Sequence, residues 1–431
     1  MANREDNTKQ VRGFFCNLQV NDAGIRSIAT MAGIKSIKAE FPLFAQHPNL
    51  VYLDSAATSQ KPQTVIDAMN GFYAAGNANI HRGLYELSAQ ATQQYETVRH
   101  RAGELIGASN PKTIAFTKGA TEAINAVAFG FLQKKLKPGD NVVITTMEHH
   151  ANIIPWQQVC QRQGASLAVL PIDACGDLRL DSLPDLLRAD TRLLAVTHIS
   201  NTLGTINPVE EIIDYAHKKN IPVLVDAAQS VGHYPLRLVE AKADFIVFSA
   251  HKMFGPQGVG VLYCREEHWD DMTPYNFGGG AIEQVTFSDT TFLDYPHRME
   301  AGTPHVAGVV GLGAAIDFIG QLDMENTSRH VQHLAALFRE GLNKIDIRPM
   351  GSPKLYGGIV SFQVDNIHPH DVAGFLAQCQ VAVRAGHHCT QPLHEFLGVP
   401  ASVRASFSIY NTPSDVDSAL QAIKDLRQFW L

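Results

Sequence analysis

Several features that mark other classes of protein are scarce in this sequence. The six cysteines among 431 residues form no C-x-x-C pair and no dense cluster, unlike the cysteines of small secreted disulfide scaffolds. A reducing, cytoplasmic location is therefore expected. There is no run of lysine or arginine and the formal net charge is −7, so the chain has no basic footprint for nucleic acid or for an anionic membrane surface. No apolar run approaches the roughly 20 residues that span a bilayer, and the N-terminus lacks the pattern of a signal peptide.

The sequence does contain enough apolar residues for a large core. With 45% hydrophobic residues in a chain of this length, roughly two or three domains are expected. Residues 1–38 are polar and show little periodicity, so we interpret them as a poorly ordered extension. Residues 39–310 are interpreted as a large domain whose first residues pack with the small one, and residues 311–431 as a smaller C-terminal domain.

Short β-branched apolar runs alternate with helical patterns through the large domain. The clearest runs are "NVVIT", "SLAVL", "RLLAVTH", "IPVLVD" and "DFIVFS". This alternation is typical of βαβ units, and near-continuous apolar strands predict an α/β fold with a mostly parallel sheet covered on both faces. After residue 310, two long helical patterns lead to the separated strands "GGIVSFQVD" and "VRASFSIY", which predicts an α+β C-terminal domain.

Polar residues stand just beyond several of the predicted strands. In an open parallel sheet, ligands bind at the carboxyl ends of the strands. The candidate site residues at these positions are His149, Asn201, Asp226, Gln229, Ser249, His251 and Lys252. Each alone has a plainer interpretation, such as a helix cap or a solvent-exposed lysine. Their joint placement at one edge of the sheet favours a functional site.

Lys252 and Asp226 form the pair that pyridoxal phosphate chemistry requires. A lysine must form a Schiff base with the cofactor, and an acid must keep the pyridine nitrogen protonated. The stretch "FTKGATEAIN" offers a phosphate cradle, in which Gly119 follows a strand and Thr121 begins a helix whose free N–H groups favour an anion. The alternative, that "GPQGVG" after Lys252 is a nucleotide-binding loop, lacks Walker spacing and leads into a strand. Pyridoxal phosphate is the expected cofactor.

The stretch "RAGHHCTQP", residues 384–392, places two histidines beside Cys389. A zinc site needs three or four converging ligands, whereas neighbours on an extended segment point to opposite sides, and no second cluster supplies the missing ligands. A buried structural cysteine is the plainer alternative. With the cofactor residues present, a thiol beside Arg384 and two histidines matches an electropositive setting that favours the thiolate. We expect Cys389 to be a nucleophile and expect no metal.

These motifs, in their order, resemble those of the fold-type I pyridoxal phosphate enzymes of aminotransferase class V. Within that family they resemble the cysteine desulfurases of the SufS and CsdA type. The resemblance runs from about residue 39 to the C-terminus, through "YLDSAATSQKP", "HRGLYELS", "TKGATEAIN", "EHHANIIPW", "VDAAQS", "FSAHKMFGPQGVGVLY", "EAGTP" and "RAGHHCTQP". The IscS and NifS type carries its cysteine in a longer, serine-rich loop that is not seen here.

The resemblance implies a role for each candidate residue. For the cofactor, it implies a covalent link at Lys252, ring contacts from Asp226, Gln229 and His149, phosphate contacts from Thr121, Ser249 and His251, and a contact from Thr303 to the phosphate of a neighbouring subunit. For the substrate, it implies Asn201, Arg404 and Arg384, and a guanidinium suits a planar carboxylate. Cys389 is the implied nucleophile.

The implied reaction converts L-cysteine to L-alanine and leaves the sulfur on Cys389 as a persulfide, with Lys252 as base and His149 as a proton relay. The sulfur would supply iron–sulfur cluster assembly or a related pathway. The implied partners are a second copy of the chain and a small acceptor protein of the SufE or CsdE type. A selenocysteine lyase or an aminotransferase is the alternative within the fold, and a zinc-binding or non-catalytic protein is the alternative outside it.

Three sites depart from the pattern usual in this group. Thr390 stands where alanine is common, Ala281 and Ile282 stand where a methionine usually occurs nearby, and His305 stands where asparagine is frequent. None of these changes removes a chemical group that the reaction needs. They bear instead on the choice of acceptor and on the loop that would face a partner subunit.

Overall fold

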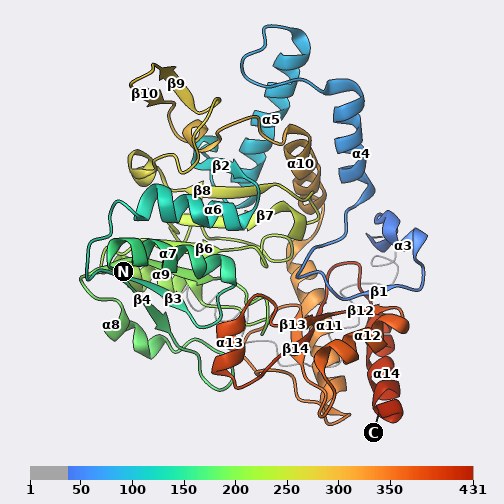
Figure 1. The fold of residues 1–431 in the computed structure, drawn as a ribbon. Coiled ribbons are helices and arrows are strands. Elements are labelled where there is room, and N and C mark those ends of the chain that lie inside the picture. The colour runs from blue at the N-terminus through green and yellow to red at the C-terminus, as the bar shows by residue number, and fades with distance from the viewer. Residues whose placement is uncertain (1–36, 431) are drawn as a thin grey trace, which may run out of the picture.

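A seven-stranded sheet lies at the centre of the large domain in the computed structural model, which describes residues 37–430 (Figure 1). The strand order is β2-β8-β7-β6-β5-β3-β4. The strands are β2 (Ile114–Thr117), β3 (Asn141–Thr145), β4 (Ser166–Leu170), β5 (Thr191–Thr197), β6 (Val223–Asp226), β7 (Phe245–Ser249) and β8 (Gly260–Cys264). Only β8 runs against its two neighbours in this sheet, so the predicted mostly parallel sheet is confirmed. The extension predicted over residues 1–38 lies almost wholly outside the described residues.

Helices cover both faces of this sheet, because successive side chains of each strand point to opposite faces. In β6, Val223 and Val225 enter one hydrophobic core and Leu224 enters the other. The first core includes residues of η2 (Phe72–Gly76), α5 (Glu86–Leu105), α8 (Leu183–Leu186), α9 (Val209–His217) and α10 (Val306–Gly320), and α4 (Gln63–Gly71) lies against α10. The second includes residues of α6 (Ala120–Ala126), η4 (Val127–Leu132) and α7 (Ile154–Gln163). Burial on both faces explains why the strands are apolar without interruption.

The small domain is built on an antiparallel sheet of order β11-β14-β13. Its elements are α11 (Met324–Asn343), β11 (Ile359–Phe362), α12 (Pro369–Gln378), β12 (Val381–Ala382), β13 (Arg384–Gly386), α13 (Gln391–Phe396), β14 (Ser402–Ser406) and α14 (Pro413–Trp430). Short β1 (Val51–Tyr52), which follows α3 (Pro42–Gln46), pairs in parallel with β12. A segment near the start of the described chain therefore joins the small domain. The boundaries 39–310 and 311–431 stay a prediction.

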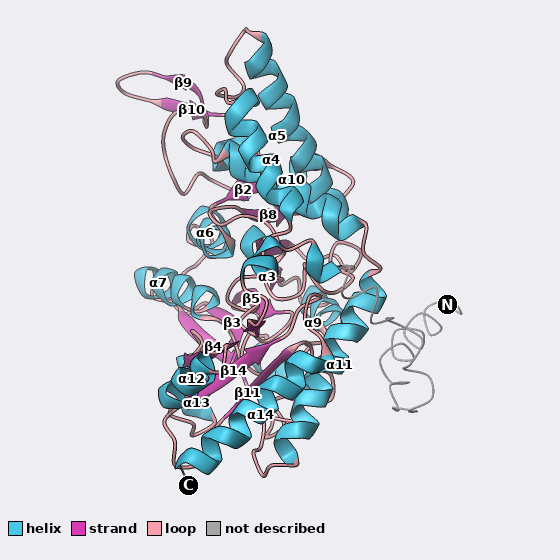
Figure 2. Cartoon of the chain, turned by 90° about the vertical axis from the view of Figure 1, so that its right-hand side faces the viewer, coloured by secondary structure: helices cyan, strands magenta, loops and turns pink. Residues whose placement is uncertain are grey.

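Two further features complete the fold. A hairpin that the sequence did not predict, β9 (Ile282–Val285) with β10 (Thr290–Phe292), projects at the same end of the molecule as the connection between α4 and α5 (Figures 1 and 2). Short 3₁₀ segments connect other elements: η3 (Pro111–Thr113), η5 (His150–Asn152), η6 (Leu180–Ser182), η7 (Ala250–Lys252), η8 (Glu266–Asp271) and η9 (His297–Met299). No single helix within residues 37–430 is long and apolar enough to cross a membrane, although α10 and α11, bent by 87° at their junction, pass that test as a pair.

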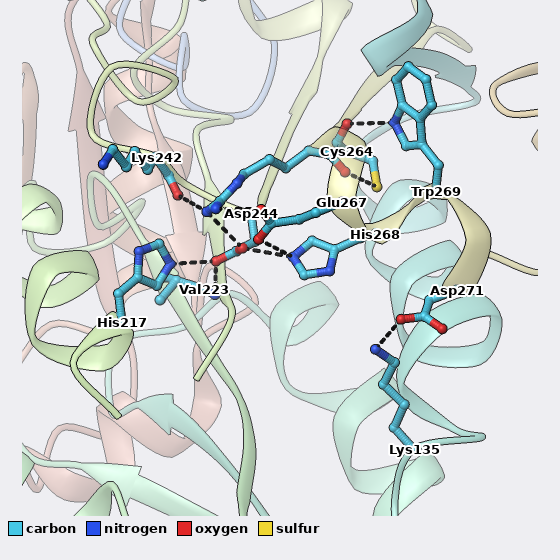
Figure 3. A network of polar contacts seen from close by, with 11 residues as sticks. Lys135, His217, Val223, Lys242, Asp244, Cys264, Glu267, His268, Trp269 and Asp271 are labelled. Carbon is cyan, nitrogen blue, oxygen red and sulfur yellow. Dashed lines mark hydrogen bonds and ion pairs between the residues drawn. The ribbon is translucent and has the colours of Figure 1, made fainter. Parts of the chain in front are cut away.

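A buried carboxylate anchors the start of β7. Asp244 accepts hydrogen bonds from Nε2 of His217 and of His268, each at 2.8 Å, and from the N–H of Val223 at 2.7 Å (Figure 3). Although burial opposes it, the hydrogen bonds from His268 and His217 hold the pKa of Asp244 below its usual value. These bonds tie β7 to β6 and α9, so the strand that ends at the predicted lysine is fixed at its other end.

Candidate active site

Lys252 ends the turn η7 directly after β7, where the large and small domains meet. Burial lowers the pKa of its amine, while the carboxylate of Asp226 at the end of neighbouring β6 opposes this shift. Arg404, Cys389 and Arg384 of the small domain also act on the charge of Lys252. The predicted acid, thiol and both arginines thus all lie near enough to the amine of Lys252 to influence its pKa.

Asp226 is 6% exposed, and burial raises the pKa of its carboxyl while Lys252 lowers it. Its Oδ1 accepts the N–H of Ala228 at 2.9 Å. A carboxylate has capacity for a further donor on its other oxygen. A cationic ring N–H is a suitable donor to this second oxygen. The ion pair would offset the free-energy cost of burying the charged carboxylate.

His149 and Gln229 are the other two predicted ring contacts. Burial, followed by the charge of Lys252, lowers the pKa of His149 to about 3, so the imidazole is neutral at pH 7. Its Nδ1 accepts the N–H of Ala151 at 3.0 Å, which assigns the remaining ring proton to Nε2. Gln229 is half-buried, and its Nε2 donates to the carbonyl of Ala56 at 2.8 Å.

A cavity of about 580 Å³ lies at the start of α6. The residues that line it are Lys118, Gly119, Thr121, Glu122, Asn125, Phe129, Ser249, His251 and Tyr275. Ser249 accepts the N–H of Ala120 at 2.8 Å through its hydroxyl oxygen, so its own proton is free to donate outward. A Cβ on Gly260 would collide with the backbone of Gly119, which explains the glycine at position 260. The cradle supplies hydroxyl, imidazole and helix N-terminal donors, as a phosphate requires.

An acid that the sequence analysis did not select joins the two predicted arginines. Asp54 accepts two hydrogen bonds from Arg384, at 3.1 and 2.8 Å, and one from Arg404 at 3.3 Å. Arg404 also donates to the backbone carbonyl of Asn201 at 2.9 Å, and burial lowers its pKa to about 10. Its buried Nε has no partner among the described residues. Two guanidinium groups share one carboxylate, so positive charge remains for a substrate carboxylate.

Asp54 could have been suspected, because it follows the apolar stretch of "YLDSAATSQKP" as the other candidates follow theirs. Its partners lie 330 and 350 positions away in the chain. The spacing of residues along the sequence could not show that Asp54 pairs with these two arginines.

Cys389 is exposed and lies in a turn, not on an extended segment as predicted. Both His388 and Cys389 have left-handed φ values, 50° and 58°. The carbonyl of His388 accepts Nδ2 of Asn201 at 2.7 Å, and the carbonyl of Cys389 accepts the N–H of His150 at 2.7 Å. The extended geometry that we predicted here, and from which we expected the neighbouring side chains to diverge, is therefore wrong. Within residues 37–430, the two groups with metal-binding geometry are His81, Glu96 and His297, and Asp244, Glu267 and His268.

The prediction that the histidines give the thiol a positive setting is wrong for His388. Burial, followed by the charges of Arg404 and His394, lowers the pKa of His388 to about 2. Its Nε2 lies 2.9 Å from the hydroxyl of Ser402. His388 is neutral at pH 7, whereas Arg384 and Arg404 are charged groups near enough to Cys389 to interact with its thiolate.

Thr303 is the one predicted site residue that the structure does not bring to the others. It is exposed and does not line the cavity at α6. Among the departures noted above, His305 accepts the N–H of Gly308 at the start of α10, and Thr390 is fully buried. Ala281 is also buried, at the base of the β9–β10 hairpin.

The residues present fit pyridoxal phosphate. They offer an amine of lowered pKa, a buried acid and a neutral imidazole whose pKa responds to the same lysine. The phosphate cradle includes Ser249, which ends β7 beside the strand that ends at Asp226. Comparison with known families agrees with this fit, since residues 51–419 match the model for aminotransferase class V. The chain belongs to the class V aminotransferase family. The predicted family and fold are confirmed, and the enzyme depends on pyridoxal phosphate.

The chain is similar over most of its length to proteins named as cysteine desulfurases. A cysteine desulfurase of Cronobacter sakazakii is 45% identical over 388 residues, which cover 89% of this chain and 96% of the relative. A probable cysteine desulfurase of Halalkalibacterium halodurans is 43% identical over 397 residues, covering 91% and 98%. The solved structure of cysteine desulfurase CsdA from Escherichia coli matches with a TM-score of 0.87 and 36% identity, covering 92% of this chain and 99% of that one.

Proposed function

We propose that this enzyme is a cysteine desulfurase, which converts L-cysteine to L-alanine and holds the sulfur on Cys389 as a persulfide. The observation that carries the proposal is the convergence of an exposed thiol from the small domain with the buried amine of Lys252 and two arginines. An aminotransferase would need the amine and the arginines but not the thiol. The names of the relatives support the same activity.

Arg404 and Arg384 bind the carboxylate of the amino acid, because both guanidinium groups retain free donors beyond those held by Asp54. Asn201 fixes Arg404 through its backbone carbonyl. This arrangement orients the substrate with its side chain toward Cys389. When bound, pyridoxal phosphate holds the substrate through its amine and draws electrons from the Cα–H bond.

Lys252 acts as the base at Cα. Burial favours its neutral amine, which can accept a proton that an ammonium could not. The carboxylate of Asp226 provides the negative charge that would pair with the cationic ring N–H of the cofactor. His149 carries its proton on Nε2 and accepts at Nδ1 from Ala151, so Nε2 is the atom from which it can return a proton to the product.

Sulfur transfer to Cys389 conserves atoms and electrons. The Cys389 thiolate forms an S–S bond to the sulfur of the substrate, and the substrate C–S bond breaks with its electron pair left on carbon. That carbon takes up a proton and becomes the methyl group of alanine. One cysteine and one enzyme thiol thus give one alanine and one persulfide, with no external oxidant or reductant.

We propose that the working unit is a homodimer formed at the end of the molecule that carries the β9–β10 hairpin. Large apolar side chains are exposed on the two segments at this end of the molecule (Figures 1 and 2), namely Tyr73, Leu84, Tyr85, Leu87, Phe277, Val285 and Phe287. Patches of this kind mark protein interfaces. The exposed Thr303 is then available to complete the phosphate cradle of the second subunit.

Sedimentation of the holoenzyme is expected to give twice the mass of one chain, because burial of this patch favours association. Replacing Leu84 and Phe287 with glutamate should produce monomers that bind pyridoxal phosphate more weakly, as Thr303→Val should in the dimer. Monomeric wild-type enzyme with full cofactor affinity would contradict the proposal.

We further propose that a small acceptor protein of the SufE type removes the sulfur, in the reducing cytoplasm. The turn that carries Cys389 is held between β13 and α13, and hydrogen bonds fix it on the large domain. The persulfide therefore stays near the cofactor and cannot be carried far. The free thiols of the five described cysteines are compatible with a reducing compartment, which cell fractionation would check.

Steady-state alanine production from L-cysteine tests the activity and the acceptor together. We expect alanine and sulfur to form in equal amounts, slowly with the enzyme alone, because the persulfide accumulates. An acceptor with its own reactive cysteine should raise the rate several-fold, and an acceptor with that cysteine changed to serine should not. A rate that neither acceptor nor reductant alters would show that removal of the persulfide is not limiting, and absence of alanine would contradict the proposed activity.

A further inference from the structure

The turn that carries Cys389 leads into α13, whose first residue is Gln391. Thr390 stands at the N-cap position, where threonine commonly accepts a hydrogen bond from the first turn of its own helix. Here it does not cap α13. Its hydroxyl instead donates to the carbonyl of His387 at 2.9 Å and shares a hydrogen bond of 2.8 Å with the hydroxyl of Thr202. The first N–H group of the helix therefore needs another partner.

His150 of the large domain provides that partner. The N–H of Gln391 donates to Nε2 of the His150 ring at 3.0 Å. The backbone N–H of His150 donates in turn to the carbonyl of Cys389 at 2.7 Å. One residue thus holds the chain at two points directly after the thiol-bearing Cα, once through its backbone and once through its ring.

The neighbouring contacts come from the same side. Asn201 and Thr202, which follow β5 in the large domain, hold His388 and Thr390. His388 and Cys389 both adopt left-handed backbone conformations, which residues with a Cβ rarely adopt and which persist only where the surroundings hold them. The turn is therefore held in an unfavourable conformation by contacts from another domain.

We infer that His150 is a positioning residue for Cys389, and that its ring nitrogen latches the turn 387–391 onto the large domain. The inference rests on the proposed function, because it takes Cys389 as the residue that accepts sulfur. Nε2 must be unprotonated to accept the N–H of Gln391. Burial, followed by the nearby His387, lowers the pKa of His150 and favours this neutral ring.

A pair of variants separates the ring acceptor from the backbone contact. His150→Leu removes the acceptor and leaves the backbone N–H, whereas His150→Gln places an amide oxygen near the position of Nε2. Amide hydrogen exchange of the holoenzyme should show faster exchange over residues 384–396 in His150→Leu, by about twofold to tenfold, the range that one net hydrogen bond provides. His150→Gln should restore most of the protection, and α11 should exchange as in the wild type in both.

The same variants test the position of the thiol. In His150→Leu, the rate at which iodoacetamide labels Cys389 should change, and the kcat for alanine should fall by about twofold to tenfold while KM for L-cysteine stays within about twofold. Thr390→Val, with Thr390→Ser as control, should act in the same direction through the contact to Thr202.

Two results would overturn the inference. The first is unchanged exchange over residues 384–396 in His150→Leu and Thr390→Val. The second is faster exchange with unchanged labelling and unchanged kcat, which would make the contacts structural only. Hydrogen exchange does not depend on the reaction, so a failure of the latch can be distinguished from a failure of the proposed function, which would appear as alanine formation that survives the loss of Cys389.

Discussion

Lys252→Ala is expected to lose the visible absorption of the bound cofactor and all measurable turnover. Lys252 lies at the edge of the sheet, and both Asp226 and Cys389 influence the pKa of its amine. In the proposed reaction this amine both links the cofactor to the enzyme and acts as the base at Cα of the substrate. A positioned acid–base group alone contributes about 10²-fold to 10⁴-fold to a rate, and loss of the covalent link adds to this. Absorption spectra and alanine production from L-cysteine are the measurements.

Two control variants sharpen this test. Lys252→Arg retains a positive charge, but a guanidinium does not deprotonate in proteins, so it should be as inactive as Lys252→Ala. Lys242→Ala removes an exposed lysine on the loop before β7 and should leave spectrum and rate unchanged. Turnover that survives in Lys252→Ala would remove the basis of the cofactor assignment, because no other residue has been placed to perform this role.

Most strands of the large sheet could be predicted because they are buried on both faces; the edge strand β4 is partly exposed and was predicted from its apolar residues alone. The run "NVVIT" coincides with β3 (Asn141–Thr145) and "SLAVL" with β4 (Ser166–Leu170). The polar residues after such runs must then gather at one edge, since parallel strands end together. This topological rule explains why Asp226, Asn201 and Lys252 could be proposed together from the sequence.

Other parts of the site depend on contacts that no local pattern encodes. Asp54 meets Arg384 only because β1 pairs with β12 and Asp54 lies beside Ser406 in β14. His150 follows the predicted His149 directly, yet its role depends on where a turn about 240 positions away happens to dock. The left-handed conformation at His388 and Cys389 could not be predicted, because neither residue is a glycine. An extended segment was therefore the simpler expectation from the sequence.

Cys389→Ala is expected to separate cofactor chemistry from sulfur transfer. The thiol is exposed and belongs to no hydrophobic core, so its removal should leave folding, the cofactor spectrum and the spectral response to added L-cysteine intact. Sulfur release and alanine formation should fall to the background rate, because no thiolate remains to attack the sulfur of the substrate. L-selenocysteine should still be processed, since its C–Se bond breaks more readily than C–S.

The comparison between the two substrates makes this prediction decisive. Cys379→Ala removes another exposed, free thiol from the small domain and should leave both activities unchanged, which controls for the general loss of a surface cysteine. Cys389→Ser retains a polar group of similar size and should fail with L-cysteine as the alanine variant does, because a hydroxyl is not ionised at neutral pH. Equal loss with L-cysteine and L-selenocysteine, together with an altered cofactor spectrum, would instead mean that Cys389 supports the site structurally. Retention of selenocysteine turnover alone would show that Lys252 and Asp226 act without the thiol, and that sulfur is removed by Cys389 itself.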